Sequence, residues 1–257
     1  EKLFEGIHTV IHNAGIFDLT AAPALLETVN IVGSQNVAEA AVRAGVQHFV
    51  QVSSTSVYGQ HPIPIQESAA PKQPVHDYGR SKWLGEEASR EVCQSAGVLW
   101  SAVRPTLVYG PRSRYCNAPF IATLSEFAAS GRTVPLPTGG SQVHAVHVAD
   151  VAGALWHICT QRYSGVFNVS DDSAINFGEL LEILGQVLAL KTRPFPVPWF
   201  AIRPLLRPAI LRPVLKQIES MARKERASRT TGGALDLRLD EDWSYFLKND
   251  NVFANDR

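Results

Sequence analysis

Short apolar runs alternate along the chain with longer stretches whose apolar residues recur every three or four positions. The short runs predict buried strands at 8–15, 48–54, 99–105, 143–148 and 165–170. The longer stretches predict helices at 23–45, 76–97, 118–131, 149–161 and 176–190. Parallel strands need long crossover connections, which are usually helices. The pattern therefore predicts an α/β fold built on a doubly wound parallel sheet.

The residue pattern of the sequence changes after residue 110. A Pro- and Gly-rich stretch occupies 133–142, and Arg-Pro pairs interrupt an apolar segment at 193–217. That segment is broken too often for a spanning helix, so we expect short helices that close over a substrate pocket, with a membrane-surface patch as the weaker alternative. We expect a single domain over 1–257, in which 111–257 is mainly substrate-binding and returns to the core near 144–170.

Composition restricts the possible partners and compartment. Lys plus Arg equals Asp plus Glu at 24 each, so charge gives no reason to expect nucleic acid as a partner. The three cysteines are odd in number and lack metal-like spacing, which indicates free thiols in a reducing compartment. The sequence has no signal-peptide pattern and no long uncharged apolar run. These features favour a cytoplasmic protein with no integral membrane segment.

Tyr78 and Lys82 form a Tyr-x-x-x-Lys pattern inside a predicted helix. Residues four apart share one helical face, so the ammonium can lie near the phenol. A phenol ionises at about pH 10, and a neighbouring cation lowers its pKa. Such a tyrosine can exchange a proton with an alcohol or a carbonyl. The pattern is common by chance in helices, so the pair alone is weak evidence for catalysis.

A cluster of hydroxyls, Ser53 to Ser56, ends the strand predicted at 48–54. The carboxyl ends of parallel strands and the helices that follow them converge on one crevice. One of these hydroxyls can therefore face the tyrosine. Strand alternation points Ser54 to one face and Ser53 and Thr55 to the other, and the residues alone do not decide between the two faces.

The sequence resembles the extended short-chain dehydrogenase/reductase family, the NAD(P)-dependent epimerase, dehydratase and 3β-hydroxysteroid dehydrogenase group. The resemblance rests on motifs that run from about residue 8 to about residue 190. They are "VIHNAG", "ETVNIVGSQNVAEAA", "SSTSVYG", "YGRSK", "VRPTLVYGP", "VHAVHVADVAGAL", "GVFNVSDD" and "FGELLEILGQVL". The resemblance implies a Rossmann-type sheet and NAD or NADP as cofactor.

The family's pattern assigns a role to each matching residue. It implies that Tyr78 is the general acid/base, that Lys82 lowers the pKa of Tyr78 and binds the nicotinamide ribose, and that Ser54 binds the reacting oxygen. It implies cofactor contacts from Asn13, Ala14, Gly15, Asn30, Tyr78, Lys82, Pro105 and Val108. It implies substrate contacts from Thr55, Leu107, Arg112 and Val143. A small-molecule substrate and a homodimer are expected from the same resemblance.

The family's glycine-rich turn for the pyrophosphate is absent from these 257 residues. We expect 1–110 to be an incomplete dinucleotide-binding core that lacks roughly two βα units. The sequence is then a piece of a longer protein or a truncated form. The missing segment also leaves the choice between NAD and NADP open.

Two departures from the family's pattern concern the substrate. Nucleotide-sugar members usually have asparagine where Leu107 stands, and arginine where Val143 stands. The loss of an amide and a guanidinium removes contacts that a charged diphosphate needs. We therefore expect an oxidoreductase that interconverts a secondary alcohol and a ketone on a weakly polar, sterol-like or other hydroxy/keto substrate. The alternatives are a nucleotide-sugar epimerase or dehydratase, and a non-catalytic paralogue that binds cofactor or partners.

Other polar residues have structural explanations. His144 and His147 lack a third ligand nearby, so no metal is expected. Glu86 and Glu87 are interpreted as an exposed helix face.

Overall fold

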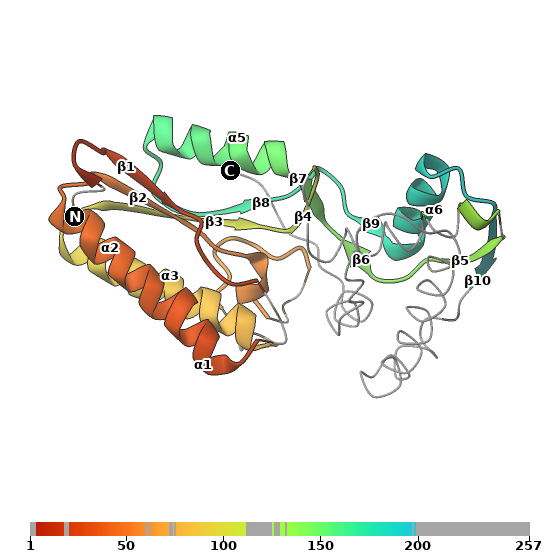
Figure 1. Cartoon of the computed structure of the whole chain (residues 1–257), viewed down its shortest axis with the longest axis horizontal. Coiled ribbons are helices and arrows are strands. Elements are labelled where there is room, and N and C mark those ends of the chain that lie inside the picture. Colours follow the sequence, from red (N-terminus) through yellow and green to blue (C-terminus); the bar gives the residue numbers. More distant parts are fainter. Residues whose placement is uncertain are drawn as a thin grey trace, which may run out of the picture. The chain divides into compact units, whose positions relative to one another are not determined.

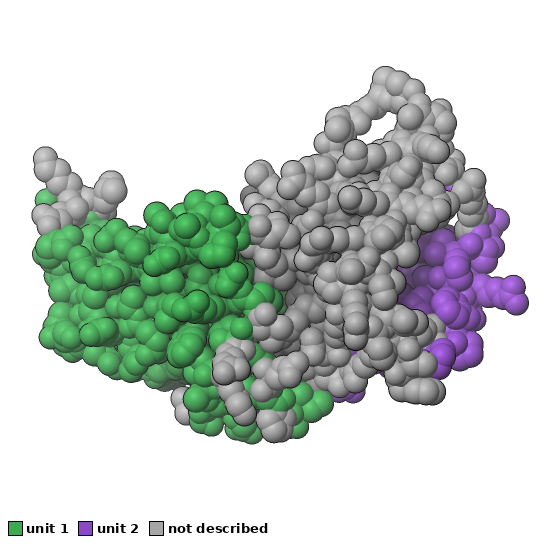
Figure 2. Space-filling model, turned by 90° about the horizontal axis from the view of Figure 1, so that it is seen from below, with its two compact units in different colours: residues 1–110, 144–172, 252–257 green, residues 111–143, 173–251 purple. Residues whose placement is uncertain are grey.

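The computed structural model describes residues 4–17, 21–59, 61, 63–71, 74, 76–111, 125, 129–131, 133–196 and 198. The chain divides into two compact units. Unit 1 comprises residues 1–110, 144–172 and 252–257, and unit 2 comprises residues 111–143 and 173–251 (Figure 2).

A parallel sheet forms the centre of unit 1. Its strands are β1 (Thr9–His12), β2 (His48–Val52), β3 (Leu99–Pro105) and β8 (Gly165–Val169), in the order β1-β2-β3-β8. All three neighbouring pairs run parallel. The predicted parallel α/β fold is therefore confirmed.

Helices cover both faces of this sheet (Figure 1). One face carries α1 (Pro23–Leu26), η2 (Glu27–Val32), α2 (Gly33–Arg43) and α3 (Asp77–Ser95), and the other carries α5 (Val148–Gln161). Alternate strand residues supply the two cores, because successive side chains point to opposite faces. Phe49 of β2 belongs to the core that contains Ala38 and Cys93, whereas Val50 belongs to the core that contains Ile158.

The helical stretch expected at 23–45 is present, but it contains a segment that sequence pattern does not reveal. Its middle turn, η2, is a π-helix, and Asn30 is the buried residue of that turn. π-Helical turns are rare and often occur at functional sites. This π-helical turn packs closely against Gly85, as described below.

Short elements complete unit 1. A 3-10 turn, η3 (Thr55–Val57), follows β2, while β4 (Leu107–Tyr109) pairs in parallel with β7 (Ala145–His147). None of the helices in the described part of the chain is long and apolar enough to cross a membrane.

Two small sheets and the helix α6 lie among the described residues of unit 2. In it β5 (Val134–Thr138) pairs in parallel with β10 (Thr192–Pro196), and β6 (Gln142–Val143) pairs in antiparallel fashion with β9 (Ile175–Asn176). The helix α6 (Phe177–Val187) begins with a capping box formed by Asn176 and Glu179.

The short helices expected at 193–217 are not found in the part of that segment that is described. Residues 193–196 belong to strand β10, and almost all of the remainder lies outside the described residues. Pro194 and Pro196 have a fixed φ and no N–H, which suits an edge strand better than a helix interior. The helix expected at 118–131 also falls largely outside the described residues.

Two glycines let α3 pack closely on its neighbours. A Cβ added to Gly85 would lie 2.3 Å from the backbone oxygen of Asn30 in η2. A Cβ added to Gly79 would lie 2.5 Å from the backbone oxygen of Ser56. Both contacts are with backbone, which cannot rotate away as a flexible side chain can. The absence of side chains at these positions therefore allows the backbone of α3 to lie close to the backbone of η2 and η3.

We expect Gly85→Ala to destabilise the protein by about 2–3 kcal/mol, because the added methyl group overpacks a backbone contact. Gly153→Ala is the matched control, since Gly153 lies inside α5 with nothing within 4 Å of the added Cβ. That change should stabilise the protein by up to about 1 kcal/mol through helix propensity. Urea denaturation of both variants measures the difference, and equal effects would contradict the close-packing argument.

Candidate active site

Ser54 lies immediately beyond the carboxyl end of β2, where the chain turns into η3. Its backbone is extended, with φ −160° and ψ 148°, and it caps η3 by accepting a hydrogen bond from the Ser56 backbone nitrogen at 3.2 Å. Its hydroxyl also donates to the Ser56 hydroxyl at 3.1 Å. The cap fixes the position of the Ser54 side chain at the edge of the sheet.

Tyr78 occupies the first turn of α3. The helix is capped by His76, whose Nδ1 accepts a hydrogen bond from the Gly79 backbone nitrogen at 2.9 Å. The Tyr78 ring is buried and lies nearly perpendicular to the Phe17 ring, with centroids 5.0 Å apart. Burial raises the pKa of Tyr78 to about 12, while a side-chain hydrogen bond with Ser54 acts in the opposite direction. The structure thus brings together the phenol and the hydroxyl that the sequence paired.

Lys82 lies one turn further along α3 and is also buried. Its ammonium donates a hydrogen bond to the backbone oxygen of Val52, the last residue of β2, at 2.7 Å. Burial lowers the pKa of Lys82 to about 8, and the charge of Glu86 partly opposes this shift.

The ammonium does not lower the pKa of the phenol in the way that the sequence suggested. Burial has the largest influence on the pKa of Tyr78. Within the described structure, Ser54 and not Lys82 is the neighbour that lowers this pKa. The physical reason is that Lys82 is directed to the end of β2 by its bond to Val52. Helical spacing places two residues on one face but does not make their tips meet.

A ledge of small residues follows β1 next to Lys82. Asn13, Ala14 and Gly15 are exposed. A Cβ added to Gly15 would lie 3.1 Å from the Asn30 side-chain oxygen and 3.6 Å from the Lys82 ammonium nitrogen. The ledge therefore combines exposed backbone with a neighbouring cation, a combination suited to a ligand that carries hydroxyl or phosphate groups.

The Asn30 side chain holds this ledge in place. Its oxygen accepts from the Ile16 backbone nitrogen at 2.8 Å, and its nitrogen donates to the Ile16 oxygen at 3.0 Å and to the Ser81 hydroxyl at 2.9 Å. Both amide hydrogens are thus committed to protein groups. These bonds link the chain next to the ledge with η2 and α3, and the cofactor contact expected of Asn30 stays a prediction.

The remaining predicted residues lie at several places. The Thr55 hydroxyl donates to the Pro105 oxygen at 3.3 Å, which joins η3 to the end of β3. The Ser53 hydroxyl is buried without a hydrogen-bond partner among the described residues. The remaining residues differ in exposure: Leu107 and Val108 are half-buried in β4, Val143 is buried in unit 2, and Arg112 lies outside the described residues.

The interpretation of Glu86 as an exposed residue is wrong. Its side chain is 1% exposed and forms a two-point ion pair with Arg104 of β3. Glu87 does lie on the solvent side, where it pairs with Arg90. The available signal was Arg104 itself, since an arginine inside an apolar strand requires a buried partner.

The two histidines considered for a metal have other contacts. His147 caps α5, accepting from the Ala149 nitrogen at 3.3 Å, and His144 is buried beside β7. Among the described residues, no group of three or more His, Cys, Asp or Glu side chains is arranged to hold a metal ion.

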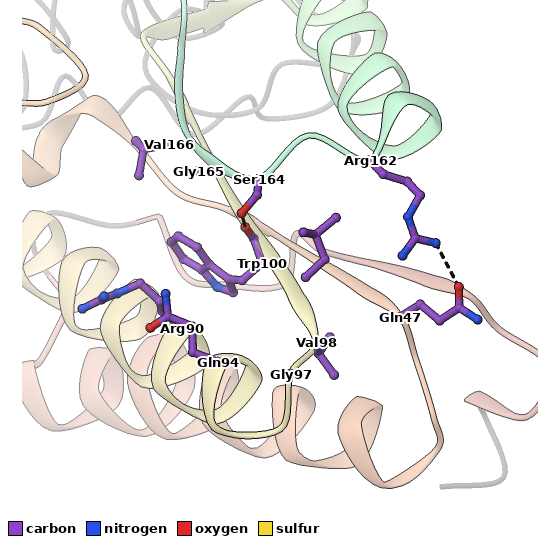
Figure 3. A pocket seen from close by; sticks show the side chains of 11 residues that line it. Gln47, Arg90, Gln94, Gly97, Val98, Trp100, Arg162, Ser164, Gly165 and Val166 are labelled. Carbon is purple, nitrogen blue, oxygen red and sulfur yellow. Dashed lines mark hydrogen bonds between the residues drawn. The ribbon is translucent and has the colours of Figure 1, made fainter.

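A pocket of about 590 Å³ lies elsewhere in unit 1 (Figure 3). Its lining includes Leu99 and Gly165, the first residues of β3 and β8, so it opens at the amino ends of the strands. Arg162 there donates to Gln47 at 2.9 Å. Ser54 and Pro105 lie at the carboxyl ends of β2 and β3, so this pocket is separate from the candidate active site.

Comparison with known proteins agrees with this geometry. Residues 1–170 match the model of a family described as the NAD dependent epimerase/dehydratase family. The chain is 32% identical over 157 residues to 3 beta-hydroxysteroid dehydrogenase type 7 of Mus musculus, covering 56% of this chain and 42% of that protein. It is 29% identical over 184 residues to UDP-glucose 4-epimerase of Vibrio cholerae, covering 68% of this chain and 53% of that protein.

A solved structure has the same fold. MoeE5 in complex with UDP-glucuronic acid and NAD is 28% identical, with a TM-score of 0.64 over 76% of this chain and 68% of that chain. The chain spans about half the length of the curated relatives it matches. Since the family match covers well over half of the sequence, the chain belongs to the NAD dependent epimerase/dehydratase family.

Proposed function

We propose that this protein is an NAD(P)-dependent oxidoreductase that interconverts a secondary alcohol and a ketone. The observation that carries the proposal is that the Ser54 hydroxyl lies close enough to the buried Tyr78 side chain to lower its pKa, at the sheet edge where Lys82 is also bound. A phenol and a hydroxyl held together can share one carbonyl or alcohol oxygen. Membership of the family supports the same reaction class.

Tyr78 is proposed to carry the proton. Its pKa is raised to about 12, so the phenol is protonated at neutral pH and is ready to donate to a carbonyl oxygen. Ser54 is proposed to donate a hydrogen bond to the same oxygen, which stabilises the negative charge that develops there. In the alcohol-to-ketone direction, Tyr78 must first lose its proton, and the Ser54 hydroxyl is the neighbouring group that lowers its pKa.

The cofactor is proposed to lie along the ledge of Asn13, Ala14 and Gly15. NAD or NADP supplies the hydride acceptor or donor, a chemistry that no side chain of this protein can provide. The exposed ledge and the Lys82 ammonium beside Gly15 fit a ribose with its hydroxyl groups. Pro105, the last residue of β3, and Val108, the middle residue of β4, are proposed to border the nicotinamide.

The proposed substrate is a weakly polar hydroxy or keto compound. Leu107 is half-buried and Val143 is buried, and neither side chain can bind a diphosphate. The similarity to the mouse 3 beta-hydroxysteroid dehydrogenase supports this class. The second candidate is epimerisation or dehydration of a nucleotide sugar, which the similarity to the Vibrio cholerae epimerase favours.

We expect Tyr78→Phe to reduce turnover by a factor of about 10²–10⁴, because the ring stays in place while the transferable proton is lost. Affinity for the cofactor should change little. Tyr163→Phe is the matched control, since the Tyr163 side chain is 46% exposed and lies beyond α5. Steady-state kinetics with a fluorescence titration of NAD(H) and NADP(H) separates the two quantities, and unchanged turnover in Tyr78→Phe would refute the assignment.

Product analysis distinguishes the candidate reactions. A dehydrogenase should produce or consume NAD(P)H in a ratio of one to each substrate molecule, followed by absorbance. An epimerase should convert its nucleotide sugar with no net change in that absorbance. Failure of the purified protein to bind either dinucleotide would favour a non-catalytic role.

A further inference from the structure

Glu86 is a buried carboxylate on the same face of α3 as Lys82. The two residues are four apart in the helix, so their side chains emerge one above the other. Their exposed fractions are 1% for Glu86 and 8% for Lys82. Two opposite charges are therefore removed from water within one helical turn, where each affects the other more strongly than at the surface.

Arg104 holds Glu86 from the adjacent strand. Its Nε lies 3.0 Å from Glu86 Oε1, and its Nη2 lies 2.5 Å from Glu86 Oε2. The guanidinium also lies over the Tyr58 ring, 4.7 Å from its centroid. Tyr58 in turn donates to the Asn168 side chain of β8 at 2.7 Å. The position of Glu86 is thus fixed by contacts that run through three elements of unit 1.

Lys82 needs a nearby negative charge because its direct partner is neutral. Its ammonium is bonded to the Val52 carbonyl, and burial penalises the charged form. The titratable groups that face it are Glu86 and Tyr78 on its own helix and His12 of β1. Burial and the charge of Lys82 lower the pKa of His12 to about 4, so His12 is neutral at physiological pH, as is Tyr78.

Within the described part of the chain, Glu86 is therefore the carboxylate whose charge favours the protonated form of Lys82. Arg104 occupies both of its oxygens and keeps it from turning toward Lys82 to form a direct ion pair. Lys82 thus gains the field of a carboxylate while its own hydrogen bond to the end of β2 is preserved.

We propose that Glu86, clamped by Arg104, is a positioning residue that keeps Lys82 protonated beside the ledge at Gly15. The role of that ammonium in catalysis rests on the proposed function, but the charge relationship does not. A purely mechanical role, in which the ion pair only fastens α3 to β3, predicts lost stability without any change in the titration of Lys82.

The test is a direct titration of Lys82 in Glu86→Gln. Lysine labelled with ¹³C reports its charge by NMR, and the Lys82 signal is the one missing from Lys82→Met. The isosteric glutamine removes the negative charge, so the midpoint should fall by about one pH unit, a tenfold change in the protonation equilibrium. Glu87→Gln is the matched control, because it removes the same charge from the exposed side of the same helix, and its midpoint should stay at the wild-type value.

The double variant Glu86→Gln/Arg104→Met covers the case in which the single variant does not fold. Replacing both members of a buried ion pair is often tolerated, whereas removing one member strands the other. The Lys82 midpoint should fall here too, but by less than in Glu86→Gln, because the positive charge of Arg104, which disfavours protonated Lys82, is removed as well. An unchanged midpoint in whichever variant folds, or an equal fall in Glu87→Gln, overturns the proposal.

The pH dependence of turnover provides the second measurement. With less support for the ammonium, the alkaline limb of the activity profile should move to lower pH in Glu86→Gln but not in Glu87→Gln. The NMR titration needs no substrate, so a shifted midpoint in an inactive protein would support the charge relationship while counting against the proposed function. An unshifted midpoint in an active protein would overturn the charge relationship while supporting the proposed function.

Discussion

The close contact of α3 with η2 and with the turn after β2 is the constraint on which the candidate site depends. Glycine at positions 79 and 85 allows helix backbone to approach backbone where any larger residue would collide. The helix face that faces inward is therefore sealed from water even though it carries tyrosine, lysine and glutamate. Each polar group on that face then needs a specific partner, because burial without one is costly.

The partners come from different strands and turns, so the polar contacts join α3 to the ends of neighbouring strands. Ser54 from the end of β2 reaches Tyr78, and the Val52 carbonyl of the same strand accepts from Lys82. Arg104 from β3 forms an ion pair with Glu86. Polar contacts that satisfy a buried helix face thus also place a phenol, a hydroxyl and an ammonium group at the carboxyl end of β2.

Burial moves the two titratable groups of the pair toward their neutral forms. It raises the pKa of Tyr78 to about 12 and lowers that of Lys82 to about 8. The phenol is therefore firmly protonated at neutral pH, while the lysine depends on its surroundings to stay charged. This difference makes the electrostatic environment of Lys82, rather than that of Tyr78, the more sensitive feature of the proposed chemistry.

The sequence by itself determined the alternation of strands and helices, the parallel sheet, and the placing of the hydroxyl cluster Ser53 to Ser56 at the sheet edge where the helix of Tyr78 begins. These follow from local periodicity and from the rule that parallel strands end at one edge. Only the tertiary structure decided that η2 is π-helical, that Asn30 binds the ledge, and that Glu86 faces inward toward Arg104. Those outcomes depend on contacts between residues far apart in the chain, and one-dimensional spacing carries no information about which face of a helix another element will cover.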